Sequence, residues 1–175
     1  ASPYGRWQNG EPNGVLKGGG AMSSVVRFNE GQKDYDLGGA TLDICERANR
    51  LGITTFCDQA TGSVQGVKEI DLYNALAASG SMTARLRYSL SYRLQEKWDS
   101  LGIQCDSGSD MARVGGWKIV SDGSNQGFTG LQREPYLHRQ DAGLAYVPAE
   151  ELTEMVMDRA SRGWALVIHA NGDKA

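Results

Sequence analysis

Ala165-Leu-Val-Ile-His-Ala-Asn-Gly-Asp-Lys-Ala175 is the most informative segment of the chain. An apolar run over 165–168 leads directly to His169, and Asp173 follows four residues later. The pattern predicts a buried strand that carries a histidine and a carboxylate into the loop at its C-terminal end. In α/β folds, catalytic groups lie at that end of the strands. Because the sequence ends where a helix would follow, we expect this chain to be an incomplete part of an enzyme.

The composition of the chain indicates one globular domain. We expect neither a membrane-spanning segment nor a nucleic-acid partner. Of 175 residues, 40% are hydrophobic and 22% are charged, and the net charge is −3 with scattered basic residues. This charge disfavours nucleic acid as a partner. No apolar run approaches the roughly 20 residues of a membrane span, and no signal peptide is evident. The separated cysteines Cys45, Cys57 and Cys105 form no CxxC motif, which favours a reducing, cytoplasmic location.

After an irregular segment over 1–36, the periodicity of the sequence predicts helices that alternate with strands. Helices are expected at 37–51, 67–78, 95–101 and 148–162, and strands at 53–57, 83–94, 117–120 and 164–169. Residues 131–147 are expected to be irregular. Two helical faces are predicted to be buried: Leu42, Cys45, Ala48 and Leu51 in the first helix, and Leu152, Val156 and Ala160 in the last. The element order favours a parallel α/β sheet, either as a flavodoxin-like binding module or as half of an eight-stranded barrel.

Lys118 and His169 are the principal candidates for functional residues. His169 at a strand end is placed to bind a metal, or to form a hydrogen bond beneath a loop. Lys118 lies between Trp117 and Ile119 in an apolar strand, where a lysine is costly unless it is paired or modified. Three roles of Lys118 remain open. It could be carboxylated and bind metal, it could form a Schiff base in another kind of barrel enzyme, or it could be paired with a carboxylate.

Two carboxylates are weaker candidates. Asp122 begins the long polar loop after the Lys118 strand, where it fits a contact to a substrate or to a metal ligand, or an ordinary turn. Asp173 could accept a hydrogen bond from a metal-bound histidine. Cys57 and Asp58 are expected to end the strand over 53–57 near the same rim, with Cys57 a buried cysteine rather than a nucleophile. His138 lies in a segment without a predicted element.

Three motifs, in order along the chain, resemble the amidohydrolase superfamily, in particular the amidohydrolase family 3 branch that includes N-substituted formamide deformylases. Residues 10–16 are similar to its Gly-x-Pro-x-Gly-x-Leu segment, and residues 118–124 to its Lys-x-x-x-Asp-Gly-Ser strand and loop. Residues 163–175 are similar to its Gly-(aromatic)-x-(apolar)-x-x-His-Ala-x-Gly-Asp-x-Ala segment. The resemblance covers most of the chain.

The resemblance implies a (β/α)8 barrel that binds one or two divalent metals, often zinc, at its C-terminal rim. The metal would activate water for attack on an amide-type small molecule. By position, Lys118 matches the lysine of strand four, which is carboxylated in members with two metals, and His169 matches the metal-binding histidine of strand five.

The departures from the family pattern concern the remaining metal ligands. The family's first-strand His-x-His pair is missing, because His138 and His169 are the two histidines of the sequence, and no late aspartate follows Ala175. We therefore expect a partial barrel over 37–175 that contains roughly strands two to five with their helices. This chain alone is expected to be inactive, with no complete catalytic set, and to self-associate through its open sheet edges.

Overall fold

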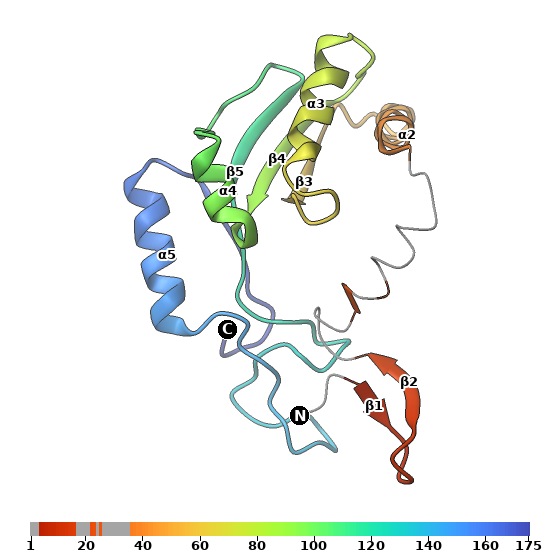
Figure 1. Cartoon of the computed structure of the whole chain (residues 1–175), viewed down its shortest axis with the longest axis vertical. Coiled ribbons are helices and arrows are strands. Elements are labelled where there is room, and N and C mark those ends of the chain that lie inside the picture. The colour runs from red at the N-terminus through yellow and green to blue at the C-terminus, as the bar shows by residue number, and fades with distance from the viewer. Residues whose placement is uncertain (1–3, 17–21, 24, 26–35) are drawn as a thin grey trace. The chain divides into compact units, whose positions relative to one another are not determined.

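The computed structural model describes residues 4–16, 22–23, 25 and 36–175 (Figure 1). The chain divides into two compact units, Ala1–Leu37 and Gly38–Ala175. Each unit is described by itself below. In the described residues, no helix is long and apolar enough to cross a membrane.

The first unit contains a small antiparallel hairpin. Strand β1 (Tyr4–Arg6) pairs with β2 (Pro12–Leu16), and Tyr4 lies opposite Leu16. The Asn9-Gly10 turn between the strands has Gly10 at a φ of 87°, which glycine adopts without steric cost. The prediction of irregular structure over 1–36 missed this hairpin; most of residues 17–35 lies outside the described part of the chain.

The second unit is built on a four-stranded parallel sheet with the strand order β3-β4-β5-β6 (Figure 1). Its strands are β3 (Thr55–Thr61), β4 (Arg85–Ser91), β5 (Ala112–Val120) and β6 (Leu166–His169). The helices are α2 (Leu37–Arg50), α3 (Lys68–Ala78), α4 (Gln95–Ser100) and α5 (Ala149–Ser161), and the 3₁₀ turn η1 (Tyr92–Leu94) precedes α4. The predicted alternation of helices and parallel strands is confirmed.

One face of the sheet carries the hydrophobic core. Leu86, Tyr88 and Leu90 of β4 and Trp117 and Ile119 of β5 are at most 1% exposed. They belong to one apolar cluster with side chains from the four helices of this unit. These side chains are Leu42, Cys45 and Ala48 of α2, Ile70 and Leu76 of α3, Trp98 of α4, and Leu152 and Val156 of α5. The opposite face, called here the inner face, carries the side chains that alternate with these core residues.

The strand order separates the two predicted architectures. In a flavodoxin-like sheet the order reverses at a switch point. Here each strand pairs with the next one along the chain, and the buried side chains of β4 and β5 share one face. A sequential parallel sheet covered on its outer face is half of a (β/α)8 barrel, so the predicted partial barrel is confirmed and the flavodoxin-like alternative is wrong.

Several predicted boundaries and buried positions were wrong. Strand β3 continues to Thr61, so Cys57 and Asp58 lie within the strand rather than at its end. Cys57 is exposed, and the three cysteines are free. In the first predicted helical face, Leu51 lies beyond α2 and is 78% exposed. In the last helix Ala160 is exposed and its neighbour Arg159 is buried.

Arg159 joins α5 to α4 and to the core. Its guanidinium donates two hydrogen bonds of 2.7 Å to the carboxylate of Asp99, and it lies 3.7 Å above the ring of Trp117. Arg162 adds a further contact of 2.8 Å to Asp99. Hydrogen bonds from Arg159 chiefly hold the pKa of Asp99 well below its usual range, and Arg162 contributes to the same shift. The buried arginine therefore has both a counter-charge and an aromatic surface.

Candidate active site

Lys118 lies on the inner face of the sheet, near the carboxyl end of β5. Its neighbours Trp117 and Ile119 point into the core with no exposed surface, so the alternation of a strand places Lys118 on the opposite face. Its side chain is partly buried, and burial lowers the pKa of the Lys118 ammonium group. The structure describes no hydrogen bond or ion pair for this side chain, so the predicted pairing with a carboxylate has no support.

His169 is on the same inner face as Lys118. The parallel register pairs Lys118 with Val167 and Val120 with His169. Paired residues of adjacent strands project to the same side of a sheet, and His169 is two residues beyond Val167. The structure therefore brings together the two principal candidates at the carboxyl ends of neighbouring strands, where barrel enzymes carry their chemistry.

The imidazole of His169 is held at one nitrogen. Nε2 is 2.7 Å from the carbonyl oxygen of Gly123, and because a carbonyl can only accept, Nε2 carries the hydrogen. The same nitrogen is 3.5 Å from Oδ1 of Asp122. Nδ1 has no partner among the described residues. With its side chain 37% exposed, His169 therefore presents an available lone pair on the inner face of the sheet.

Asp122 is fully buried behind His169. Its carboxylate accepts backbone N–H bonds from Leu131 and Gly172 at 2.8 Å and from Asn171 at 2.9 Å. Burial raises the pKa of Asp122, but these three donors and the nearby imidazole outweigh that effect, and the net pKa lies below the ordinary value. Asp122 is therefore placed next to a candidate metal ligand, with most of its acceptor capacity already used.

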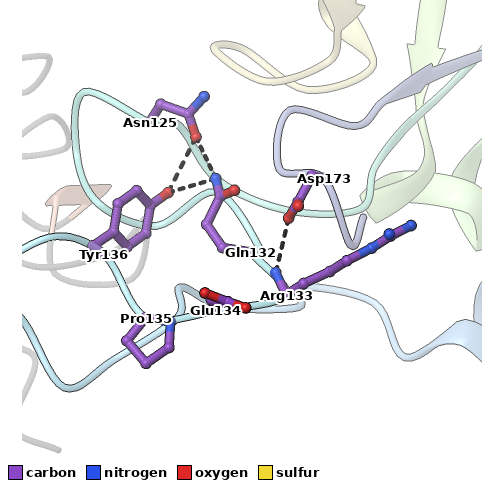
Figure 2. A pocket seen from close by; sticks show the side chains of 7 residues that line it. All are labelled: Asn125, Gln132, Arg133, Glu134, Pro135, Tyr136 and Asp173. Carbon is purple, nitrogen blue, oxygen red and sulfur yellow. Dashed lines mark hydrogen bonds between the residues drawn. The ribbon is translucent and has the colours of Figure 1, made fainter.

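Asp173 lies on the surface beside an open concavity of about 510 Å³ (Figure 2). Its Oδ1 accepts the backbone N–H of Arg133 at 2.8 Å. Figure 2 shows Gln132 and Tyr136 pointing toward Asn125, whose Oδ1 accepts hydrogen bonds from both, whereas the side chain of Arg133 extends away from them. The structure thus places Asp173 on the rim next to the Asp122 contacts, and it describes no contact between Asp173 and His169.

Sequence reasoning missed a second carboxylate that organises a rim loop. Glu69 is 5% exposed and accepts backbone N–H bonds from Gly62, Val64 and Gln65 after β3. Asp58 was placed at a strand end, yet within β3 it accepts hydrogen bonds from Thr61 and Tyr73. The partners of Glu69 lie only four to seven residues before it, so its place in the first turn of α3 was a local signal for these contacts. The contact from Tyr73 to Asp58, by contrast, depends on the packing of α3 on the sheet. His138, at a φ of 64° in the loop, is exposed.

The donors on the inner face fit part of a metal site. A neutral imidazole nitrogen is a common ligand for divalent transition metals, and a lysine without a counter-charge becomes an oxygen ligand once it is carboxylated. Among the described residues, no group of three or more His, Cys, Asp or Glu side chains is placed to hold a metal ion. Lys118 and His169 are the two predicted metal ligands that the structure places on this inner face.

The sequential parallel sheet, with its core on the outer face, defines this chain as part of a (β/α)8 barrel. The sequence model of the Amidohydrolase family matches residues 3–175, and the chain belongs to this family. A comparison with curated proteins found no match.

Two solved structures share the fold. One is an uncharacterized metal-dependent hydrolase from Pyrococcus furiosus, with a TM-score of 0.70, 22% identity, and coverage of 99% of this chain and 36% of that one. The other is an uncharacterized metal-dependent hydrolase from Pyrococcus horikoshii OT3, with a TM-score of 0.70, 21% identity, and coverage of 98% of this chain and 35% of that one. The chain thus spans about a third of the length of these structures.

Proposed function

We propose that this chain is the part of a metal-dependent amidohydrolase that supplies Lys118 and His169 to the metal centre. The observation that carries the proposal is the parallel register, which puts both side chains on the inner face of adjacent strands. Membership of the Amidohydrolase family and the fold shared with two metal-dependent hydrolases support it. Zinc is the metal we propose, since a neutral imidazole and oxygen donors both suit it.

The proposed reaction is hydrolysis of an amide-type C–N bond in a small molecule. When bound, the divalent metal would acidify a water molecule and polarise the carbonyl group. His169 would bind the metal through Nδ1, because Nε2 is occupied by the carbonyl of Gly123. Lys118 would bind through the carboxylate that its amine forms with carbon dioxide. Asp122 would hold His169 from behind, and Asp173 would contact the substrate from the rim.

An N-substituted formamide is the substrate class that we propose for the first experiment, on the strength of the three sequence motifs. The protein, together with the segments that complete its barrel, is assayed on matched formamides and acetamides before and after treatment with a chelator. The proposal expects formamide hydrolysis that is lost with the chelator and restored by zinc. Hydrolysis that survives full removal of metal contradicts metal dependence, and a preference for acetamides contradicts the substrate class alone.

A Schiff-base enzyme is the second candidate, and one observation favours it. Burial lowers the pKa of Lys118, and a neutral amine is the reactive form in carbonyl addition. Family membership favours the metal-dependent reaction instead. Borohydride reduction in the presence of a carbonyl substrate separates the two, because it traps a covalent adduct on Lys118 only if a Schiff base forms.

We further propose that residues 1–175 alone are inactive and self-associate in the cytoplasm. The family pattern requires a His-x-His pair that this sequence does not contain. Strands β3 and β6 are the outer strands of the sheet, and unpaired edges favour association with another chain. Sedimentation analysis of the 175-residue chain is expected to show dimers or larger species, and a monomer at all concentrations contradicts this part of the proposal.

A further inference from the structure

Asp122 connects two rim loops that are distant in the sequence. Its Oδ2 accepts the backbone N–H groups of Leu131 and Gly172, and its Oδ1 accepts that of Asn171. Leu131 follows β5 by 11 residues, whereas the other two donors follow β6. We call Asp122 and these three backbone groups the Asp122 junction. Because a buried carboxylate that loses its donors is costly, the junction fixes the two loops relative to each other.

The two loops are in contact beyond the carboxylate itself. The Lys174 N–H donates to the carbonyl of Leu131 at 3.1 Å, and Asp173 accepts the Arg133 N–H. A Cβ atom on Gly172 would lie 1.8 Å from the carbonyl oxygen of Leu131, so the backbones approach as closely as glycine allows. The concavity in Figure 2 is therefore bounded by residues that the junction holds in place on both sides.

The junction also reaches His169. Ser121, next to Asp122, donates its backbone N–H to the His169 carbonyl at 3.0 Å and its hydroxyl to the same oxygen at 2.5 Å. On the other side, Gly123 accepts the hydrogen of Nε2. With Oδ1 of Asp122 at 3.5 Å from Nε2, the negative charge favours the tautomer that carries its hydrogen there. Residues 121–123 thus contact both the backbone and the ring of His169.

We propose that Asp122 is a positioning residue that fixes the ring orientation and tautomer of His169 through the Asp122 junction. The inference deepens the proposed function by stating how Asp122 acts on His169, and it rests on that function only in taking His169 as a metal ligand. In this tautomer Nδ1 presents its lone pair to the inner face of the sheet, and the two rim loops and the imidazole become ordered together.

The test compares variants of the buried Asp122 and the half-buried Asp58 by nitrogen NMR of histidine-labelled protein. Asp122→Asn replaces one acceptor oxygen with an amide group that faces backbone donors. Asp58→Asn is the matched control, because Asp58 also accepts several hydrogen bonds, from Ala60, Thr61 and Tyr73, but at β3. We expect a single Nε2–H tautomer of His169 in the wild-type protein and in Asp58→Asn, and a mixture of tautomers in Asp122→Asn.

Both variants are expected to lose stability, so a loss of stability alone does not distinguish a positioning role from a structural one. The proposal is overturned if His169 keeps one tautomer in Asp122→Asn, or if Asp58→Asn alters the ring signals equally. As a second readout, zinc affinity should fall about 10- to 100-fold in Asp122→Asn and stay unchanged in Asp58→Asn. Zinc affinity is measured on the protein together with the segments that complete its barrel. Equal zinc affinity in the two variants contradicts the inference, whereas absence of zinc binding in the wild-type protein so completed contradicts the proposed function.

Discussion

Lys118 and His169 project from the same face of adjacent parallel strands, and each has a nitrogen without a hydrogen-bond partner in the described part of the chain. The register that pairs Lys118 with Val167 and Val120 with His169 produces this relationship. The packing of Trp117 and Ile119 into the core maintains it, because a shift by one residue would turn the lysine into the core. The hydrophobic pattern of two strands thus determines the position of both candidate metal ligands.

The first prediction concerns the amine of Lys118. Because burial lowers its pKa, more of this amine is unprotonated near neutral pH, and the unprotonated form adds to carbon dioxide. With ¹³C-labelled bicarbonate, the wild-type protein is expected to show a carbamate signal that disappears in Lys118→Gln. Lys97→Gln, which changes an exposed lysine, is the control and should keep the signal. A signal that persists in Lys118→Gln disagrees with the assignment.

The second prediction concerns the buried arginine of α5. Arg159→Ala removes both hydrogen bonds from Arg159 to the Asp99 carboxylate, leaves the contact from Arg162, and exposes the ring of Trp117. The free energy of unfolding should fall by about 3 kcal/mol, because two hydrogen bonds between charged groups and the packing of a buried side chain are lost. Arg113→Ala removes an ion pair with Asp110 whose side chain is 92% exposed, and it should cost less than about 1 kcal/mol. Urea unfolding measures both, and similar losses in the two variants contradict this account.

The third prediction is the pH dependence that follows from Asp99. Its pKa is lower in the folded protein than the ordinary 3.8, chiefly through the hydrogen bonds from Arg159. The resulting stabilisation is complete above the unfolded value, near pH 4 and higher, and is lost as the pH falls toward the folded value. Unfolding measured between pH 6 and pH 2 should therefore show a steeper loss of stability for wild-type protein than for Arg159→Ala. Parallel curves would exclude this contribution.

The fourth prediction tests the close contact between the rim loops. In Gly172→Ala the new methyl group overlaps the carbonyl of Leu131, so the loops must separate at a cost of about 1–3 kcal/mol. Gly115→Ala is the control in β5, because its Cβ would meet its nearest atom at an ordinary 3.6 Å. Thermal unfolding should show a lower Tm for Gly172→Ala only. An unchanged Tm in that variant means that the loops have more room than the structure shows.

Local patterns predicted most of the fold. The glycines that end α2 and α5, Gly52 and Gly163, have φ values of 76° and 79°, as expected for left-handed helix ends. The apolar stretches around Ile119 and Val167 indicated buried strands. Where prediction was wrong, a tertiary contact decided the outcome: Asp58-Gln-Ala-Thr61 is typical of a turn, yet pairing with β4 extends the strand through it.

The sequence identified individual candidate residues of the site but not the contacts between them. The sequence singled out Lys118, Asp122, His169 and Asp173 because each stands in or just after a strand. It did not show that Asp122 bonds to Asn171 and Gly172, which are 49 and 50 residues away. Nor did a helical pattern identify Arg159 as buried, because its burial depends on Asp99 and Trp117 from two other elements.

The metal content of histidine variants tests the central claim most directly. The protein, with the segments that complete its barrel, is loaded with zinc and dialysed, and the zinc per chain is measured by mass spectrometry for wild-type, His169→Ala and His138→Ala. His138 is exposed in a rim loop and serves as the matched control. The account predicts that His169→Ala loses at least one zinc ion per chain while His138→Ala retains the wild-type content. Full zinc content in His169→Ala would contradict it.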